Sequence, residues 1–302
     1  MDITLICIVS FALFFTMLER LIPFRKGLPL FRKGYWVDLI WYTFIQSALL
    51  TIYFFDWIFK WLEQTLQVPK EGYLSHWPIG ALWLLFFVTH DFYIYWFHRA
   101  QHHVKWLWRT HEAHHSVQEV DWLAGSRSHI AEILINQTIE FAPIWILLDP
   151  ETALLVSKLK AVTDAGWGMF IHANIKLNLG KLGYIINGPS MHQWHHAEHQ
   201  DVYYANYGTK LAIWDHLFGT AYVTQKTPTI WGLPYDYPKD YFAQHLFAFW
   251  RFDVEKLENS KWYNQYTNLR QHLYNAISKK PIEMGYIRKP LEHGDDVSKA
   301  ES

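Results

Sequence analysis

Histidines with the spacing of metal ligands are concentrated in the middle of this sequence. Of the 18 histidines, 13 fall between residues 90 and 199. Nine of them form three clusters and one outlier: His98 and His102; His111, His114 and His115; His192, His195 and His196; and the single His172. Helical residues three and four apart share a face, so each cluster can direct its imidazoles toward one point. The pattern predicts metal binding.

The ordinary alternative is that these histidines are hydrogen-bonded core residues, as a single buried histidine most often is. Eight or nine neighbouring imidazoles without a metal would leave many donors and acceptors unmatched, which makes that alternative costly here. Structural zinc sites usually include thiolates, and Cys7 is the one cysteine of the chain. Nine nitrogens exceed the needs of one ion. We therefore expect two ions, and a pair of irons that activates O₂ is the preferred interpretation.

The motifs around these histidines resemble those of the fatty acid hydroxylase and sterol desaturase family of integral membrane, non-haem di-iron oxygenases. The similar stretch runs from about Asp91 to Tyr222. It comprises HDFYIYWFHRAQH, HEAHH, SRSHIAE, IHAN, and a long segment with HQWHH, NYG and WDHLFGT. The order and spacing of three histidine boxes followed by NYG and WDHLFGT make this resemblance specific.

Two positions depart from the family pattern. Gly168 lies near the outlier, where some members supply a tenth histidine, and Ile130 stands where the family often has proline. Whether one ion takes a water, or His129 or His199 as a further ligand, is therefore open.

The resemblance implies O₂-dependent oxidation of a lipid C–H bond, by hydroxylation or desaturation of a sterol-like, fatty acyl or other lipid. It implies two iron ions and an external electron donor. The chain has no GxGxxG fingerprint and cannot build an iron–sulfur centre from one cysteine, so we expect a separate reductase, cytochrome or ferredoxin. A net charge of −1 argues against nucleic acid as a partner. The oligomeric state is open.

Neutral imidazoles do not offset the charge of two metal ions, so carboxylates should orient the rings and balance that charge. The candidates are Asp91, Glu112, Glu132, Asp201 and Asp215. The resemblance adds hydrogen bonds from Asn174 and Asn206 around the ligands. A different class of protein is also compatible with clustered histidines: a zinc-containing membrane hydrolase or a non-catalytic metal-binding membrane protein. Zinc hydrolases commonly use three protein ligands for each ion, which fits nine histidines poorly.

Composition and five apolar segments predict a membrane protein. The chain is 51% hydrophobic and 18% aromatic, while its mean hydropathy of −0.08 indicates that a polar part is joined to the apolar one. The segments are 3–18, 36–59, 77–97, 130–148 and 152–171. The second, third and fifth are long enough to span, the first is slightly short, and the fourth is the weakest because Glu132, Asn136, Gln137 and Glu140 interrupt it.

The orientation follows from basic residues in the first loop, which crowd between Arg20 and Lys33 and predict that this loop is cytoplasmic. Five spans then bring all four histidine groups to the cytoplasmic face, and we expect a bacterial inner-membrane protein. The expected parts are transmembrane helices (1–97), a helical cap with two histidine boxes (98–129), a membrane hairpin turned at 149–151 (130–171), a cap with the third box (172–290) and a disordered tail (291–302). We expect a lipid pocket lined by side chains such as Trp96, Phe97, Trp106, Trp122 and Trp167.

Overall fold

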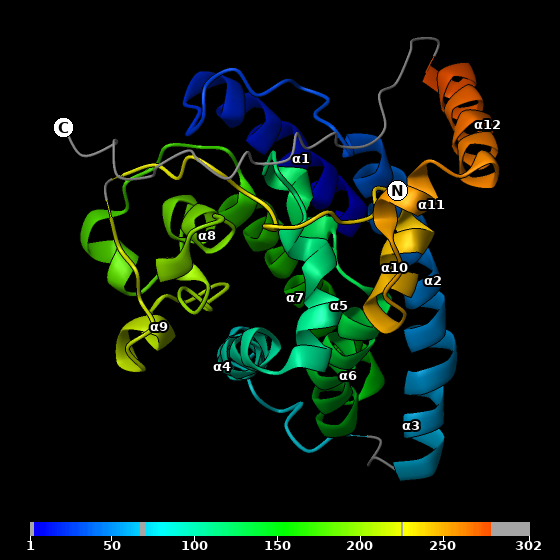
Figure 1. The fold of residues 1–302 in the computed structure, drawn as a ribbon. Helices are drawn as coiled ribbons and strands as arrows, with labels where there is room; N and C mark the ends of the chain where they lie inside the picture. Colours follow the sequence, from blue (N-terminus) through cyan, green and yellow to red (C-terminus); the bar gives the residue numbers. More distant parts are fainter. Residues whose placement is uncertain (1–2, 67–70, 225, 279–302) are drawn as a thin grey trace.

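The computed structural model describes residues 3–66, 71–224 and 226–278, and over these ranges its regular structure is helical (Figure 1). Three isolated β-bridges join loops, and no longer strand occurs among the described residues. The elements are α1 (Ile3–Leu21), η1 (Val37–Gln46), α2 (Ser47–Ile52), η2 (Tyr53–Phe59), α3 (Lys60–Leu66), α4 (Ile79–His103), α5 (Lys105–His115), η3 (Trp122–Ser126), α6 (Ile130–Leu147), α7 (Pro150–His172), η4 (Gly180–Tyr184), α8 (Pro189–His195), η5 (Gln200–Val202), α9 (Ile213–Leu217), α10 (Tyr241–Phe249), α11 (Val254–Glu258) and α12 (Lys261–Ser278).

Four helices are long and apolar enough to cross a membrane: Ile3–Leu21, Val37–Leu62, Ile79–His103 and Ile130–Leu147. The expected all-helical membrane architecture with a histidine-rich site is confirmed. The sequence analysis ranked segment 130–148 as a weaker membrane span than segment 152–171, and this ranking was wrong. By length and apolar composition α6 could cross a membrane, whereas α7 is not apolar enough. Lys158, Lys160 and Asp164 make α7 too charged to qualify by composition.

The hairpin of α6 and α7 turns at the expected residues. α6 ends at Leu147, and the side chain of Asp149 accepts hydrogen bonds from the backbone N–H groups of Glu151 and Thr152 at the start of α7. An acceptor at this position satisfies N–H groups that have no partner inside the helix, and Pro150 suits the first helical turn. The turn directs α7 back so that it delivers His172 to the histidine-rich region.

A single extended residue turns the chain between α4 and α5. Val104 has φ −104° and ψ 113°, which ends α4 at His103 and lets α5 begin at Lys105. The two helices therefore meet at a corner instead of forming one rod. In Figure 1, α4, α5, α7 and α8 lie in the middle of the molecule, and the run from α2 to α3 forms one edge. The corner brings the first two histidine clusters face to face.

The polar residues of α6 face other parts of the protein, as expected for a segment at membrane depth. The Tyr93 hydroxyl lies 3.3 Å from Asn136, and Lys160 lies 2.7 Å from Glu140. Gln137 is partly buried.

The remaining segments surround this centre. α1 packs on α7 through Phe15 and Phe170, whose ring centroids are 6.2 Å apart. Its buried Glu19 accepts 2.8 Å hydrogen bonds from the backbone N–H groups of Trp122 and Asn174. The last described elements of the chain are α11 and α12. The tail predicted to be disordered, 291–302, lies outside the described residues.

Candidate metal centre

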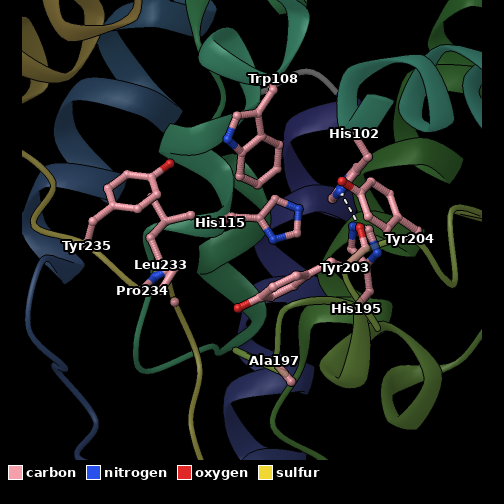
Figure 2. Close-up of a pocket in the computed structure, with 11 residues that line it drawn as sticks. His102, Trp108, His115, His195, Ala197, Tyr203, Tyr204, Leu233, Pro234 and Tyr235 are labelled. Atoms are coloured by element: carbon pink, nitrogen blue, oxygen red, sulfur yellow. Dashed lines mark hydrogen bonds between the residues drawn. The ribbon is translucent and has the colours of Figure 1, made fainter. Parts of the chain in front are cut away.

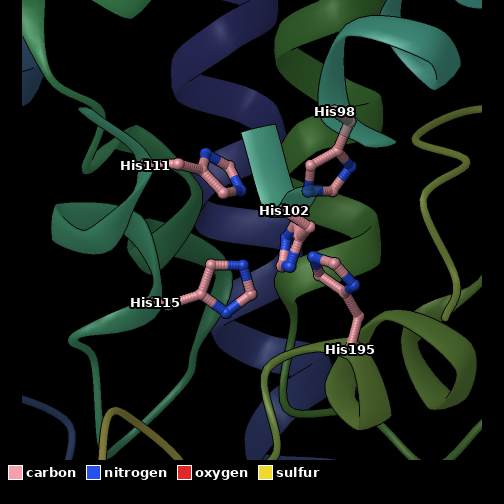
Figure 3. Close-up of side chains that lie close together, drawn as sticks. All are labelled: His98, His102, His111, His115 and His195. Atoms are coloured by element: carbon pink, nitrogen blue, oxygen red, sulfur yellow. The ribbon is translucent and has the colours of Figure 1, made fainter. Parts of the chain in front are cut away.

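The structure brings all nine clustered histidines together in two groups. The five-histidine group contains His98, His102, His111, His115 and His195, and the four-histidine group contains His114, His172, His192 and His196. Each residue of a group offers one ring nitrogen, and these nitrogens all lie within 4.8 Å of one another. Figure 3 shows the five rings of the first group turned toward a common point.

α5 supplies ligands to both groups. His111 and His115 are four residues apart on one face and join the five-histidine group, while His114 points to the four-histidine group. The ring centroids of His111 and His114 are 5.0 Å apart. One helix therefore fixes the separation of the two groups.

α8 repeats this arrangement in the other direction. His192 and His196 are four residues apart and belong to the four-histidine group, whereas His195 joins the five-histidine group. The first group is completed by two residues one turn apart at the end of α4, and the second by the last residue of α7. The two groups are thus built on shared helices.

Backbone carbonyl groups accept hydrogen bonds from the Nδ1 atoms of three rings in the five-histidine group. The Nδ1 atoms of His98, His102 and His195 lie 2.8, 3.0 and 2.8 Å from the carbonyl oxygens of Tyr207, Tyr203 and Ala205. A carbonyl oxygen can only accept a hydrogen bond, so these Nδ1 atoms carry the proton and each Nε2 is left with a lone pair. The segment 203–207 thus sets both the tautomer and the direction of the rings.

The Nε2 atoms of the five-histidine group are buried, and all five lack a hydrogen-bond partner within the described part of the chain. A buried nitrogen without a partner costs free energy. A metal ion would satisfy the five lone pairs together, and the donor set therefore fits such an ion.

In the four-histidine group, ring nitrogens lie close to one another without a proton between them. The Nε2 atom of His172 lies 2.9 Å from Nε2 of His192 and 3.2 Å from Nε2 of His114. His114 and His172 place Nδ1 at 3.1 and 2.7 Å from the carbonyl oxygens of Arg127 and Gly168. Both Nδ1 atoms are therefore protonated, and neither Nε2 atom can donate to the other. A cation among these nitrogens would replace repulsion between lone pairs by ligation, so this donor set fits a metal ion as well.

Burial keeps these imidazoles in the neutral form that binds metals. For six rings, desolvation lowers the pKa well below 6.5, and the neighbouring histidines lower the pKa further. These rings belong to His111, His114, His115, His192, His195 and His196. They are neutral near pH 7.

Comparison with known proteins bears on the same stretch of chain. Residues 83–220 match the family model for fatty acid hydroxylase, and this range includes all nine histidines. This stretch of the chain resembles the fatty acid hydroxylase family.

Individual relatives give the same result. The chain is 31% identical to ornithine lipid hydroxylase OlsE of Rhizobium tropici, over 68% of this chain and 62% of that protein. It is 28% identical to human alkylglycerol monooxygenase, over 68% of this chain and 44% of the relative. It therefore spans less than two thirds of the length of either relative. A shorter match, 34% identical over 36% of this chain and 40% of the relative, is to the very-long-chain aldehyde decarbonylase GL1-8 of Oryza sativa. No solved structure gives a significant match.

Within the two histidine groups, Glu132 is the predicted acidic residue that meets a ring. Its Oε1 atom lies 3.1 Å from Nδ1 of His111, and both side chains are buried. The structure thus places one of the candidate carboxylates on a ring of the two groups. Most of the other rings with an assigned Nδ1 partner use backbone carbonyls, which sequence reasoning did not consider.

Asp91 and Asp215 were expected to contact the histidine rings, but they contact the loop that follows α8. Asp91 is buried and accepts hydrogen bonds from four donors: Thr209 Oγ1, the N–H groups of Lys210 and Leu211, and Trp214 Nε1. Asp215 accepts from the N–H groups of Tyr207 and Gly208 and from Thr220. Burial raises the pKa of Asp215 to about 6. These two carboxylates hold the loop whose carbonyl groups hold the histidines.

The two asparagines also hold loops. Asn206 has φ +60° and donates to the carbonyl groups of Met191 and Tyr222, which ties α8 to the segment after α9. Asn174 exchanges hydrogen bonds with the backbone of Arg25, at 2.8 and 2.9 Å. Both side-chain amides hold backbone segments near the site, and neither amide contacts a histidine ring of the two groups.

The possible additional ligands lie outside both groups. His129 caps α6 and stacks on His245 at 4.4 Å, and His199 caps the short helix η5. Asp201 lies 3.7 Å from His199 at the surface, with a side chain 71% exposed. Among the described residues, the structure therefore assembles nine candidate ligands and not ten or eleven.

A third cluster lies beside the site in α4, α6 and α7. His90, Glu140 and Asp164 have the spacing of metal ligands. However, the Lys160 ammonium lies 2.8, 2.7 and 2.6 Å from these three side chains. The lysine occupies the position that a cation would take.

A cavity of about 240 Å³ opens on the five-histidine group (Figure 2). Its lining residues are His102, Trp108, His115, His195, Ala197, Tyr203, Tyr204, Gly232, Leu233, Pro234 and Tyr235. The aromatic residues named from the sequence do not line it: Trp106 is 64% exposed, and Trp122 is buried in a core with Phe15 and Leu123.

Sequence reasoning missed the segment 231–235, whose residues 232–235 form one wall of this cavity. Trp231 forms an isolated antiparallel bridge with Ala197 and donates from Nε1 to Gln193 at 2.9 Å. Tyr235 donates to Glu112 at 2.6 Å, and Arg251 lies 2.7 Å from the same carboxylate. No motif in the sequence indicated where this segment folds.

Proposed function

We propose that this protein is a membrane-bound, di-iron, O₂-dependent enzyme that oxidises a C–H bond of a lipid, as a hydroxylase or desaturase. The observation that carries the proposal is the presence of nine imidazoles in two groups, eight of them in buried residues, with their Nε2 atoms turned inward. The names of the relatives support lipid oxidation: one is a lipid hydroxylase and another a monooxygenase of alkylglycerols.

The ligand set favours iron over zinc. The five-histidine group would hold one ion and the four-histidine group the other. Catalytic zinc is usually held by three protein ligands, whereas these groups offer five and four nitrogens. Bound iron would supply the activation of O₂ and the oxidation of an unactivated C–H bond, which side chains cannot perform alone.

The residues of the chain would orient the ligand rings, keep their protons on Nδ1 and exclude water from the cavity. The carbonyl groups of 203–207 and Glu132 keep the rings in one tautomer, and Asp91 and Asp215 keep the loop in place. The apolar walls of the cavity would bring a hydrocarbon segment to the five-histidine group. Electrons would come from a separate reductase, cytochrome or ferredoxin.

We also propose that the histidine site lies on the cytoplasmic face of a membrane, a bacterial inner membrane in our interpretation. The basic first loop supports this orientation, although Arg32 is buried and pairs with Asp38 and Asp121 at 2.7 and 2.8 Å. The α6–α7 hairpin supports it further, because it returns the chain to the side from which it entered. The lipid would be sterol-like, fatty acyl or another lipid of the bilayer.

Metal content tests the proposal most directly. The full chain should be produced in iron-57 medium, purified in detergent, and analysed for metals and by Mössbauer spectroscopy. About two irons per chain with spectra of a histidine-rich pair would support it. Zinc retained under iron-replete conditions, with no O₂ consumption when electrons are supplied, would instead favour a zinc hydrolase or a non-catalytic metal protein.

A further inference from the structure

We propose that the two metal positions have unequal access: an uncharged hydrocarbon segment reaches the five-histidine group, and the four-histidine group is closed. This inference rests on the proposed function for its substrate, but its geometry concerns only the chain. Three separate observations support it.

The first observation is the lining of the cavity. Its wall includes His102, His115 and His195, all of the five-histidine group, and none of the four histidines of the other group. Figure 2 shows these three rings on one side and Leu233, Pro234 and Tyr235 on the other. A molecule in this cavity meets one metal position.

The second observation is burial. All nine histidines are described, and eight are buried, whereas His102 is partly exposed. His102 is also a member of the cavity lining. The cavity is thus bordered by the least buried of the nine candidate ligands, whose Nε2 atom is itself buried.

The third observation is the close cover over the four-histidine group. η3 lies against His172 so tightly that a Cβ atom added at Gly125 would lie 2.7 Å from Nδ1 of His172. On the other side, the Gln193 side chain donates to the His172 carbonyl at 2.9 Å. A glycine is required here because any side chain would displace the ring.

The chemistry of the cavity defines what can enter it. Its lining contains aromatic and aliphatic side chains and no Asp, Glu, Lys or Arg. The hydroxyl of Tyr235 is used in its bond to Glu112, which Arg251 neutralises. A cationic group entering here would lose its hydration without gaining a partner of opposite charge. The cavity therefore takes an uncharged hydrocarbon segment, and a cationic headgroup stays outside.

Release of iron to a small chelator tests unequal access without using catalytic activity. The ferrous full-length protein in nanodiscs should be mixed with bipyridine, and the coloured complex followed with time. We expect two phases of about one iron each, a fast one from the five-histidine group and a slow one from the other. Release of both ions in one phase would overturn the proposal.

Leu233 lies 5% exposed in the cavity wall and provides the decisive pair of variants. Leu233→Trp fills the cavity and should slow the fast phase by roughly fivefold or more, while Leu233→Ala widens it and should accelerate that phase. Neither should change the slow phase. Because the larger side chain can prevent folding, Leu233→Ala keeps the test valid by itself. Equal effects on both phases would contradict unequal access.

Gly125→Ala is the matched variant for the closed group. Its methyl group should displace His172 and weaken the slowly released ion, leaving the fast phase unchanged. An effect confined to the fast phase would assign the phases the other way and overturn the proposal.

Two probes of equal chain length test the nature of the occupant. Dodecanol should slow the fast phase in the unmodified protein, whereas 1,12-diaminododecane, which carries an ammonium group at both ends, should not. Equal protection by both probes, or by neither, would contradict an uncharged hydrocarbon site. If the protein holds zinc, the same release experiment with a chromogenic zinc chelator still tests access, so this inference and the proposed function can fail separately.

Discussion

His98 and Tyr207 are 109 residues apart in sequence, and the Nδ1 atom of the histidine lies 2.8 Å from the backbone carbonyl oxygen of the tyrosine. Tyr207 itself is held through its N–H group by Asp215. A ring at the end of α4 is thus oriented by a loop that follows the third histidine cluster. The metal centre depends on this loop as much as on the helices that carry the ligands.

Removal of a ligand should remove metal and activity together. His195→Ala deletes one nitrogen of the five-histidine group, and His111→Ala deletes another. We expect metal below about one ion per chain and activity reduced by about 100-fold or more, with membrane insertion intact. His272→Ala, on the exposed surface of α12, is the control and should be nearly silent. Full metal content and turnover in His195→Ala would show that the ligand assignment is wrong.

Glu132 should tune metal affinity through His111. Glu132→Ala removes the acceptor 3.1 Å from Nδ1 of His111 and should weaken metal binding by about 10- to 100-fold. Glu132→Gln retains an amide oxygen in the same place and should have a smaller effect. Competition with a chelator of known affinity measures both. Equal loss in the two variants would indicate that the negative charge matters more than the hydrogen bond.

Asp91 should contribute to stability because it satisfies four buried donors. Asp91→Ala leaves Thr209, two backbone N–H groups and the Trp214 indole without their acceptor. Each unsatisfied group costs about 1–3 kcal/mol, so we expect a melting temperature well below that of the unmodified protein. Asp201→Ala is the matched control, since its exposed side chain should contribute little. Similar melting temperatures for both variants would refute the proposed role.

Asp149 should give a pH-dependent contribution through its cap on α7. Hydrogen bonds from Ser75, Thr152 and Glu151 hold its pKa at about 2, below the ordinary 3.8. A lowered pKa stabilises the fold while the carboxylate is charged, so this contribution is complete above about pH 4 and is lost toward pH 2. Asp149→Ala should cost about 1 kcal/mol at neutral pH.

Asp149→Asn keeps the cap without the titration and isolates the pH effect. The difference in melting temperature between this variant and the unmodified protein should be constant from about pH 8 to 5 and shrink below that range. If the difference in melting temperature instead grew as the pH fell, the pKa of Asp149 would not be lowered by folding.

The sequence identified the ligand candidates because helical spacing is local. The i, i+3 and i+4 positions of HEAHH and HQWHH require only that each segment be helical, and the family resemblance then supplied the order of the boxes. Roles that depend on backbone atoms could not be predicted this way. The carbonyl groups of Tyr203, Ala205 and Tyr207 carry no residue-specific signal, and any residue at those positions would offer the same oxygen.

Long-range contacts account for most of what was missed. Tyr235 meets Glu112 across 123 residues, and only the folded chain brings the loop 231–235 onto the cavity. The apolar segments were found by hydropathy, but their ranking failed because it counted charges in α6 and overlooked those in α7. In the structure, Lys160 of α7 is fully buried between acidic groups, which hydropathy alone does not reveal.

The ammonium group of Lys160 also has a consequence for biogenesis. Two of its three partners, His90 and Glu140, belong to α4 and α6, which are synthesised before α7. A lysine that enters the bilayer alone is costly, but one that enters beside waiting acceptors is not. The order of the helices along the chain therefore places two of the Lys160 acceptors ahead of the helix that carries this lysine. The helix that carries His172 is thus joined to α4 and α6 by the polar contacts of Lys160 as well as by apolar packing.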